Sequence, residues 1–590
     1  SGSGYVGRDD AAEMDRAYRE LRTLEHRIQL FRLRRTHLVP DSAPELRRIG
    51  RSFGFLSAPE KEITALWRDR SRAVRKLHEK LFYRPLLAAA AELTTDEVRL
   101  TPEAAHARLA ALGYRDPEGA MRHLATLTAG LSRRASIQRQ LLPVMLGWFA
   151  DGADPDAGLL AFRRVSDELG ATHWYLKMLR DSRAAAERMA YVLSCSRYVA
   201  ELIEHAPETV AMLGDDAELV PRARAAVLAS VTSAITRHDE PEALLWAVRA
   251  LRRREIVRTA IADLAGLAGL DEVGRALSDA AVATIAGGLQ AARHTVTRRH
   301  GGELPTRFAV VAMGRLGGGE QGYGSDADVL FVHDPLPGAE ERQAQETAMA
   351  VFSELRRLLA LQGPEPPLDV DPDLRPEGRN GPLTRTIDSY ARYYERWSEP
   401  WEAQALVRAV PVAGDAELGE RFVQLVDPLR RPAGGLSEAD VREIRRIKAR
   451  VESERLPKGV DPRRHVKLGP GALADVEWTV QLLQLRHAHE VPGLRTTSTV
   501  AALHAAVAAD LVTPGDAAVM EAAWRLASRV RNAIFLWRGR ASDQLPGTVR
   551  DLNGVARIVG HPPGSAARLE EEYRRVTRRA RAVVERVFYG

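Results

Sequence analysis

The sequence predicts a mainly helical protein in which a small sheet is embedded. Over long stretches, apolar residues recur every three to four positions with arginine and glutamate between them, a spacing typical of amphipathic helices. These stretches are 11–35, 61–83, 186–206, 220–236, 243–292, 437–455, 473–489 and 566–588. Strand-like patterns occur at only three places, 307–314, 327–333 and 368–371, and a helix-like segment at 339–361 separates the last two.

Composition narrows the class of protein. The chain has 590 residues, enough for about three to five domains, and 45% of them are hydrophobic and 28% charged, which indicates folded domains. No apolar run approaches the roughly 20 residues that span a bilayer, so no membrane partner is expected. The net charge is +6, but basic and acidic residues alternate along the helices, so we expect solvated helix faces and no nucleic-acid partner.

A single cysteine, Cys195, bears on redox chemistry and localisation. One cysteine excludes an internal disulfide framework and a cysteine-based zinc site, and it fits a reducing, cytoplasmic location. Because no neighbouring residue activates it, we interpret Cys195 as a small buried apolar residue.

The two ends of the chain are related by an internal repeat. Residues 27–83 align without gaps on residues 533–589, at an offset of 506 positions. Gly54 then meets Gly560, and the aromatic pair Phe82-Tyr83 meets the pair at 588–589. We therefore expect that the chain opens with the end of one structural unit and closes with the end of a second, complete one, as a fragment of a tandem protein would.

The most informative stretch is "GRLGGGEQGYGSDADVLFV", residues 314–332. Residues 317–322 match G-x-G-x-x-G, but a dinucleotide fingerprint opens a helix, whereas here a strand follows. The Gly-Lys-Ser/Thr of a Walker loop is absent. An EF-hand would need oxygen ligands at the positions of Leu330 and Pro337.

What remains is a strand, a glycine-rich turn and a second strand that begins with two aspartates. Asp326 and Asp328 are two residues apart, so their side chains point to the same side of the strand. Beyond them the strand is apolar on both faces, which predicts burial. Two unpaired carboxylates so close would raise each other's pKa, and a divalent cation such as Mg²⁺ would relieve this. The ordinary alternative is an acidic strand start that faces solvent.

A third carboxylate is expected from a neighbouring strand. The stretch "LDVDPDLRP" offers Asp369 and Asp371 on one face, and Pro372 should end that strand. The arginines that follow are suited to phosphate oxygens and together could clamp a triphosphate. They are Arg375, Arg379 and Arg385.

These residues resemble a known family. Gly-Ser followed by Asp-x-Asp on a strand resembles the nucleotidyltransferase superfamily that includes DNA polymerase beta. The longer stretches "RLGGGEQGYGSDADVLFV", "VDPDLRPEGRNGPL" and "WEAQALVRAVPVAGDAEL" resemble the glutamine-synthetase adenylyltransferases, the bifunctional adenylylating and adenylyl-removing enzymes. That family has two nucleotidyltransferase halves in tandem, each followed by a helical domain, and its C-terminal half carries adenylylation.

The resemblance implies specific roles. Asp326, Asp328 and Asp371 would be catalytic and would hold two Mg²⁺ ions. The residues implied to bind the ATP substrate are Gly324, Ser325, Arg375, Arg379 and Lys467.

Further candidates and two departures from the family pattern come from the same comparison. Asp475 and Glu477, in the stretch "KLGPGALADVEW", are candidates for lining the site, and an ordinary acidic helix N-terminus explains them equally well. The sequence does not decide whether Asp369, Asp475 or Glu477 joins the site. Asp373 stands where many family members have arginine, and Ala472 stands where a second glycine is common.

The resemblance also implies a domain plan. We expect the end of an upstream helical domain at 1–84, a helical linker or regulatory region at 85–170, a nucleotidyltransferase catalytic domain of the DNA polymerase beta type at 171–435, and a helical bundle domain at 436–590. The implied fold is thus mainly α, with an embedded α+β nucleotidyltransferase domain whose small mixed sheet is flanked by helices.

The implied reaction is transfer of AMP from ATP to a tyrosine of glutamine synthetase, with release of pyrophosphate. Glutamine synthetase would be the protein substrate, and a PII-type nitrogen-signalling protein a further partner. Two alternatives remain open at this point. One is phosphorolytic removal of AMP or uridylyl transfer to a signalling protein. The other is a regulatory module that binds nucleotide without chemistry.

Overall fold

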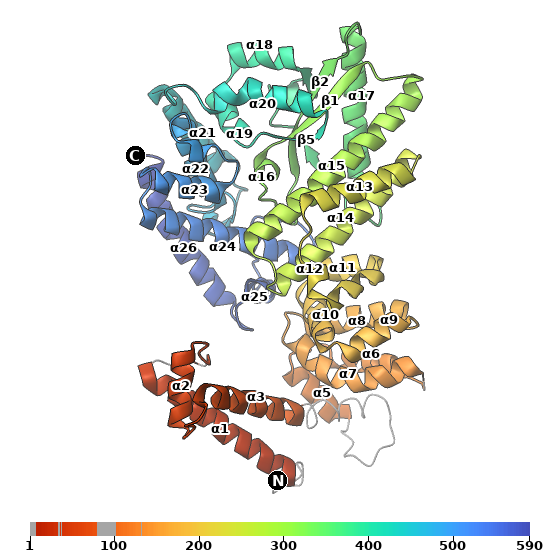
Figure 1. The fold of residues 1–590 in the computed structure, drawn as a ribbon, viewed down its shortest axis with the longest axis vertical. Helices are drawn as coiled ribbons and strands as arrows, with labels where there is room; N and C mark the ends of the chain where they lie inside the picture. The colour runs from red at the N-terminus through yellow and green to blue at the C-terminus, as the bar shows by residue number, and fades with distance from the viewer. Residues whose placement is uncertain (1–7, 33–35, 37, 79–101, 131) are drawn as a thin grey trace. The chain divides into compact units, whose positions relative to one another are not determined.

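The computed structural model describes residues 8–32, 36, 38–78, 102–130 and 132–590. These form two compact units, one of Ser1–Asp151 with Phe162–Arg183 and one of Gly152–Ala161 with Ala184–Gly590, and each is considered by itself. The protein is mostly helical with a small mixed sheet, as the sequence predicts (Figure 1). The pair Phe82-Tyr83 of the repeat lies outside the described residues. None of the described helices is long and apolar enough to cross a membrane.

The first unit is built of helices. They are α1 (Arg8–Arg32), α2 (Ala43–Ser52), α3 (Pro59–His78), α5 (Pro102–Ala111), α6 (Pro117–Thr128), α7 (Arg133–Ala150), α9 (His173–Asp181) and part of α8 (Pro155–Leu169). Leu24, Ile49 and Ile63, one from each of α1, α2 and α3, form a small buried core.

Three helices at the end of the chain reproduce the pattern of α1 to α3. They are α24 (Pro514–Arg538), α25 (Val549–Val559) and α26 (Ala566–Val587). At the offset of 506 positions, α24 has the same bounds as α1, and α25 begins where α2 begins. Gly54 and Gly560, the paired glycines that follow α2 and α25, both adopt positive φ, at 86° and 102°. The sequence repeat therefore coincides with a repeat of local structure.

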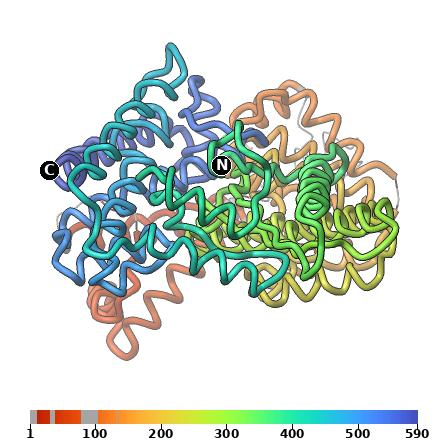
Figure 2. The backbone as a smooth tube through the Cα atoms, turned by 90° about the horizontal axis from the view of Figure 1, so that it is seen from above, coloured from red at the N-terminus to blue at the C-terminus, as the bar shows by residue number. Residues whose placement is uncertain are grey.

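The second unit begins with helices that lead to the sheet. They are α10 (Arg183–Cys195), α11 (Arg197–His205), η2 (Pro207–Gly214), α12 (Asp216–Leu219), α13 (Arg224–Arg237), α14 (Pro241–Leu264) and α15 (Leu270–His300). α14 and α15 run side by side (Figures 1 and 2).

Two of the expected helical stretches are each divided in two. The stretch 243–292 breaks at 265–269, where Gly266 adopts a φ of +70° that other residues avoid. The stretch 186–206 breaks at Ser196, whose hydroxyl accepts a hydrogen bond from the amide of Val199 and so caps α11. The apolar spacing in the sequence continues across both breaks, because the helices on either side each keep their apolar residues on a buried face.

The sheet has five strands, two more than the sequence suggests. They are β1 (Thr306–Ala312), β2 (Ala327–Pro335), β3 (Val370–Asp371), β4 (Thr384–Thr386) and β5 (Val410–Gly414). The order is β3-β2-β1-β5, with β4 also on β2. β1 is antiparallel to β2 and β5, whereas β3 and β4 run parallel to β2. Strands lie at all three expected places, although the third is confined to Val370–Asp371 of the expected 368–371, and the helix between the last two is confirmed as α17 (Glu341–Ala360).

Both faces of the central strand β2 are buried, as its sequence predicts. Val329 and Phe331 enter a core shared with α13, α14, α15 and α17. Leu330 and Val332 enter a second core, shared with α18 (Ile387–Trp397) and α20 (Ala416–Arg430). The sheet is therefore an inner layer, and its polar chemistry is confined to the strand ends.

The remaining elements form the C-terminal part of this unit and its connections. They are α16 (Gly314–Gly317), η3 (Gly378–Asn380), α19 (Pro400–Leu406), α21 (Glu438–Glu454), η4 (Pro462–Arg464), α22 (Leu473–His487), η5 (Pro492–Leu494) and α23 (Thr499–Ala508). Helices α21 to α26 share one hydrophobic core, to which Ala403 and Val407 also belong. The segment around α19 thus belongs both to the sheet and to the C-terminal helices.

Close approach of α14 and α15 leads to a first prediction. A Cβ added at Gly287 would lie 2.6 Å from one methyl of Val248 and 2.9 Å from the other. Gly287→Ala should lower the free energy of unfolding by about 1–3 kcal/mol, because the packed helices must move apart. The measurement is a denaturant titration followed by circular dichroism. Gly302→Ala is the matched control, since a Cβ there meets no atom within 4 Å. Equal effects of the two substitutions would contradict this account.

Candidate active site

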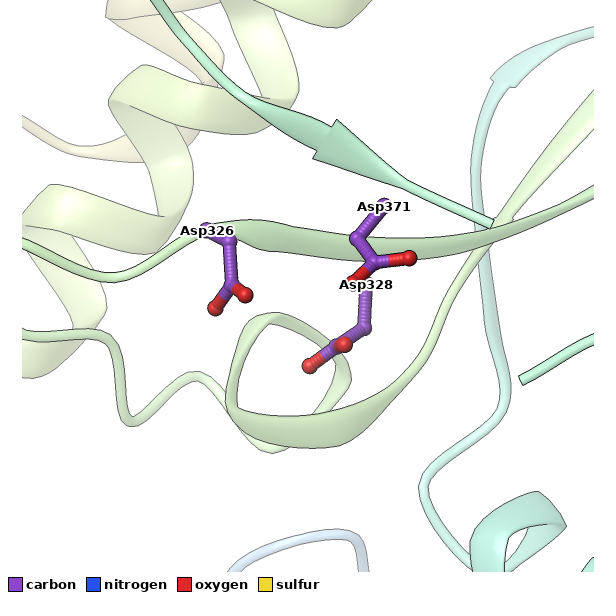
Figure 3. A group of neighbouring side chains, drawn as sticks. All are labelled: Asp326, Asp328 and Asp371. Carbon is purple, nitrogen blue, oxygen red and sulfur yellow. The ribbon is translucent and has the colours of Figure 1, made fainter. Parts of the chain in front are cut away.

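Three carboxylates converge at one end of the sheet (Figure 3). Asp326, Asp328 and Asp371 each offer an oxygen such that all three atoms lie within 4.8 Å of one another. Asp326 and Asp328 project from the start of β2 to the same side, as the two-residue period predicts. The parallel pairing of β2 with β3 puts Asp371 beside Asp328. The expected third carboxylate is therefore Asp371.

Asp369 takes a different part. Its backbone carbonyl accepts a hydrogen bond of 2.8 Å from the amide of Ala327, which fixes the register between the two strands. Its side chain is exposed and is not part of the convergent group. Alternation along a strand would place Asp369 and Asp371 on the same face. Asp369 does not join the carboxylate group, because β3 begins only at Val370.

The electrostatics of the cluster centre on Asp328. Burial, and then the negative charges of Asp326 and Asp371, raise the pKa of Asp328 to about 7. Lys467 and Arg408 lower it, but not enough to cancel these effects. Near neutral pH a substantial fraction of Asp328 therefore holds a proton unless a cation is bound. Three convergent carboxylates whose negative charge is not balanced are suited to a divalent cation.

A glycine allows the loop to lie against Asp328. Gly314 has a φ of +51°, and a Cβ there would lie 2.0 Å from Oδ2 of Asp328. The amide of Met313 donates to the carbonyl of Asp328 over 2.8 Å. The glycine-rich loop therefore packs directly against this carboxylate. A side chain at position 314 would displace either the loop or the carboxylate.

Gly324 and Ser325, the residues expected to contact a triphosphate, have structural tasks in this loop. A Cβ at Gly324 would lie 2.4 Å from the ring of Phe535 on α24. The hydroxyl of Ser325 accepts a hydrogen bond of 3.0 Å from the amide of Gly322. Packing against α24 thus already requires a small residue at 324, and the contact of both residues with phosphate stays a prediction.

Tyr323, between these glycines, anchors the loop to α14. Its hydroxyl donates a hydrogen bond of 2.9 Å to Oδ2 of Asp263. Burial raises the pKa of Asp263 to about 6. The sequence does not single out either side chain, because a tyrosine among glycines and a lone aspartate in a helix have no distinctive spacing.

The three arginines after β3 divide into different roles. Arg375 is buried, and its guanidinium donates to the carbonyls of Pro372 and Gly381. Arg379 is exposed and pairs with Asp373. Arg385 pairs with Glu377 and lies over the ring of Tyr393. The loop thus holds Arg375 in place, whereas only a surface ion pair holds Arg379.

A buried ionic junction joins the glycine-rich loop to the C-terminal helices. Glu320 accepts hydrogen bonds from the amide and the hydroxyl of Thr499, over 2.6 and 2.8 Å. Arg408 lies 3.3 Å from Glu320, donates to the hydroxyl of Thr499 and reaches the carbonyl of Gly314. These residues were missed from the sequence. The available signal was that two charged residues, in "GGGEQG" and "ALVRAVP", stand within otherwise apolar or small segments.

Glu477 belongs to this same junction. Arg408 and Arg315 lower its pKa against the opposing effect of burial, and the indole of Trp524 donates to it over 3.2 Å. Lys467 is exposed, and its charge lowers the pKa values of both Asp328 and Glu477. Lys467 therefore acts electrostatically on the carboxylate cluster, as a residue that lines the site would.

Asp475 is part of a separate network. It accepts hydrogen bonds from Lys448 over 2.5 Å, from Arg581 over 3.0 Å and from the amide of Gly471 over 2.7 Å. Lys448 and Asp475 are each about 2% exposed. This network ties the "KLGPGALADVEW" turn to α21 and α26, and three donors occupy the oxygens of Asp475.

Cys195 is buried, as expected, and burial raises its thiol pKa to about 11. At neutral pH the thiol is therefore protonated, which disfavours a role as nucleophile.

The raised pKa of Asp328 leads to a pH prediction. The carboxyl holds its proton more tightly in the folded state than in the unfolded state, where its pKa is about 4. Without divalent cations, the folded protein should therefore lose up to roughly 4 kcal/mol of unfolding free energy as the pH rises from 4 to 7. Asp328→Asn should remove this loss, measured by denaturant titration with a chelator at pH 5 and pH 8.

The control for that comparison is Asp369→Asn, which alters an exposed carboxylate in the neighbouring strand. It should leave the pH dependence unchanged. A wild-type stability that responds to pH in the same way as Asp328→Asn would contradict the charge repulsion.

Comparison with known proteins gives the following matches. Residues 186–425 match the family model described as glutamate-ammonia ligase adenylyltransferase, and this range contains all three carboxylates. Residues 1–82 and 443–588 match the model described as GlnD PII-uridylyltransferase, so one model matches both ends of the chain.

Curated relatives are similar over the full length of this chain. Proteins of Streptomyces coelicolor and Streptomyces avermitilis are each 56% identical over all of it, which is 60% of their own length. A protein of Leifsonia xyli is 50% identical and is covered over 58% of its length. All three are called bifunctional glutamine synthetase adenylyltransferase/adenylyl-removing enzyme, so the chain spans about three-fifths of the relatives it matches. The resemblance inferred from sequence is thereby confirmed: the chain is similar over its full length to these bifunctional enzymes, and its residues 186–425 match the glutamate-ammonia ligase adenylyltransferase family model.

Proposed function

We propose that this chain transfers AMP from ATP to a tyrosine hydroxyl of glutamine synthetase and releases pyrophosphate. The observation that carries the proposal is the convergence of Asp326, Asp328 and Asp371 within the segment that matches the adenylyltransferase family. The names of the full-length relatives support the same reaction. In this proposal, the site regulates nitrogen assimilation through its protein substrate.

We infer a nucleotidyltransferase fold of the DNA polymerase beta type for the sheet region. Two carboxylates at the start of a buried strand and a third on its parallel neighbour support this inference. We also infer the domain plan 1–84, 85–170, 171–435 and 436–590. The matching helices at the two ends, and the single family model that matches both, support assigning 1–84 to the end of an upstream unit.

We infer that the three carboxylates hold Mg²⁺, with two ions in the complete site. Bound Mg²⁺ would neutralise charge on the triphosphate and on the attacking and leaving oxygens. Asp326 and Asp328 would bind on the triphosphate side, and Asp371 would face the acceptor oxygen.

The chain's own residues then organise the transfer. The tyrosine oxygen attacks the α-phosphorus, the bond from that phosphorus to the bridging oxygen breaks, and pyrophosphate leaves. Asp371, whose carboxylate accepts a hydrogen bond of 2.8 Å from the amide of Asp373, would take the phenolic proton. Because the reaction needs no covalent enzyme intermediate, positioning and charge complementarity supply most of the catalysis.

Residues around the cluster would bind the triphosphate. Lys467 already acts on the charge of Asp328, so a phosphate placed there would lie within its field. Arg379 can exchange its surface pair with Asp373 for a phosphate, whereas Arg375 supports the loop through backbone carbonyls. Gly324 and Ser325 would present backbone amides to the phosphate chain.

The alternative reactions differ in how far they are supported. The match to the uridylyltransferase model covers only the ends of the chain and leaves out the carboxylate cluster, so adenylyl transfer is favoured. Phosphorolytic removal of AMP uses the same atoms in reverse. We also propose a PII-type signalling protein as a partner and the cytoplasm as the location, both on the strength of the family resemblance.

The decisive experiment is the intact mass of purified glutamine synthetase after incubation with this chain, ATP and Mg²⁺. We expect a gain of one AMP per subunit. Asp326→Asn should lower the initial rate by at least about a hundred-fold, the typical effect of removing one preorganised group from such a site. Asp369→Asn is the matched control and should retain activity, because its side chain stands outside the cluster. Near-normal transfer by Asp326→Asn would refute the site.

A second experiment separates the alternatives. The chain should form product with ATP and not with UTP, assayed by mass in the same reaction. Preferential use of UTP would favour uridylyl transfer. Loss of AMP from adenylylated glutamine synthetase in phosphate, with no forward transfer, would favour removal. Binding of ATP without turnover in either direction would favour a nucleotide sensor.

A further inference from the structure

A basic hollow is lined by residues that adjoin the ionic junction in sequence. It is lined by residues from four segments: Val407 after α19, Arg430 and Arg431 at the end of α20, Gln484 and Ala488 at the end of α22, and the connection to α23, which supplies Leu494, Arg495, Thr496 and Thr497. Its empty space is roughly 260 Å³ when open solvent is included, and about 20 Å³ of that can hold the centre of a water-sized sphere. So small a space admits the polar end of a compact anion and no nucleotide.

The charges around the hollow are unbalanced. Three guanidinium groups line it. Among the described residues, Arg430 and Arg431 both form an ion pair with Asp427, and Arg495 forms none. Burial, and then the positive charge of Arg430, lower the pKa of Arg431, and Arg495 adds to this effect while Asp427 opposes it. Like charges held together at a partly buried place are costly unless an anion balances them.

Ordinary structural roles account for part of the arrangement. Arg430 donates to the carbonyl of Ala409 over 3.2 Å and is 8% exposed. Arg495 donates to the carbonyls of Ala488 and His489, at the end of α22. These contacts hold two guanidiniums rigidly at the rim. They do not neutralise charge, because carbonyl oxygens carry only partial charges.

The hollow is connected to the glycine-rich loop through a short path. Thr496 and Thr497 line it, and two residues later Thr499 donates to both oxygens of Glu320. Val407 also lines the hollow, and the next residue, Arg408, donates to Thr499 and pairs with Glu320. A movement of the segment at Val407 or of the segment at Thr496 and Thr497 would therefore be transmitted to the glycine-rich loop that packs against Asp328.

We propose that the hollow formed by Arg430, Arg431 and Arg495 is a second binding site, which takes a small oxyanion and acts on the glycine-rich loop through Thr499. Guanidinium groups bind carboxylate and phosphate oxygens in paired hydrogen bonds, so either class of anion satisfies the chemistry. The effect of the anion on catalysis rests on the proposed adenylyl transfer. Binding itself does not.

Binding is tested by calorimetric titration with inorganic phosphate and, separately, with succinate, at low ionic strength. The protein is first saturated with Mg²⁺ and a non-hydrolysable ATP analogue, so that phosphate does not enter the carboxylate site. We expect at least one of the two anions to bind, and Arg431→Gln and Arg495→Gln each to weaken it at least ten-fold. Binding of phosphate alone identifies a phosphate-type ligand, and binding of succinate alone identifies a carboxylate.

The matched control is Arg421→Gln, on the same helix as Arg430. Arg421 pairs with Asp334, away from the hollow, so its loss should leave anion binding unchanged. If Arg495→Gln fails to fold because α22 loses its capping donor, Arg431→Gln still decides the result. No binding of either anion, or equal binding by Arg431→Gln and wild type, overturns the site.

The coupling is tested by the rate of adenylyl transfer with and without the bound anion. We expect a change of about five-fold or more in the wild type and in Arg421→Gln, a typical size for coupling between sites, and none in Arg431→Gln. If the wild-type rate of adenylyl transfer is the same with and without the bound anion, the coupling is refuted. A chain that transfers no AMP under any condition refutes the proposed function and leaves the binding result standing.

Discussion

Repulsion among three carboxylates is the constraint on which the structure around the sheet depends. Their oxygens lie within 4.8 Å of one another, and the pKa of Asp328 rises to about 7 as a result of its burial and its two negative neighbours. A free loop would relax such a cluster by moving apart. Here the strands are held by backbone pairing and by two apolar cores, one on each face of β2, so the cluster persists. The stability of the cores offsets the charge repulsion and holds the three carboxylates close together.

The glycine-rich loop has a mechanical role as well as a chemical one. Gly314 lets the chain lie against the Asp328 carboxylate, and Gly324 lets it pack on Phe535 of α24. Tyr323 ties it to α14, and Glu320 ties it to Thr499. Three separate regions of the chain thus hold one loop. This arrangement explains how α23 and α24, which contribute none of the three carboxylates, help to hold the loop beside them.

The two ends of the chain carry the same local structure for a physical reason. In both copies a long helix is followed by a shorter one, a glycine with positive φ, and a further helix. Each arrangement buries the apolar stripe of all three helices in a shared core. The C-terminal copy extends that core through α21 to α23 and supplies Phe535 to the loop. The first copy has a smaller buried core, made of Leu24, Ile49 and Ile63.

The sequence by itself determined the features that depend on local periodicity. The alternation in "GSDADVLFV" predicted two carboxylates on one side of a strand buried on both faces, and both parts are confirmed. The fixed offset of 506 positions predicted the repeat whose helices have matching bounds. The acidic residue in "LDVD" that joins the site, Asp371, was also among the candidates, because a second strand end had to lie nearby.

The tertiary structure alone decided the features that arise between distant segments. β4 has three residues, and β5 contains a proline, so neither has a readable pattern. The break at 265–269 leaves the helical periodicity of both neighbours intact. Arg408, Glu320 and Thr499 are far apart in sequence, and only folding makes them one junction. Arg375 illustrates the same limit, since an arginine suited to phosphate by composition is held instead by the carbonyls of its own loop. Pairing between distant charges depends on the whole packing, which no local spacing encodes.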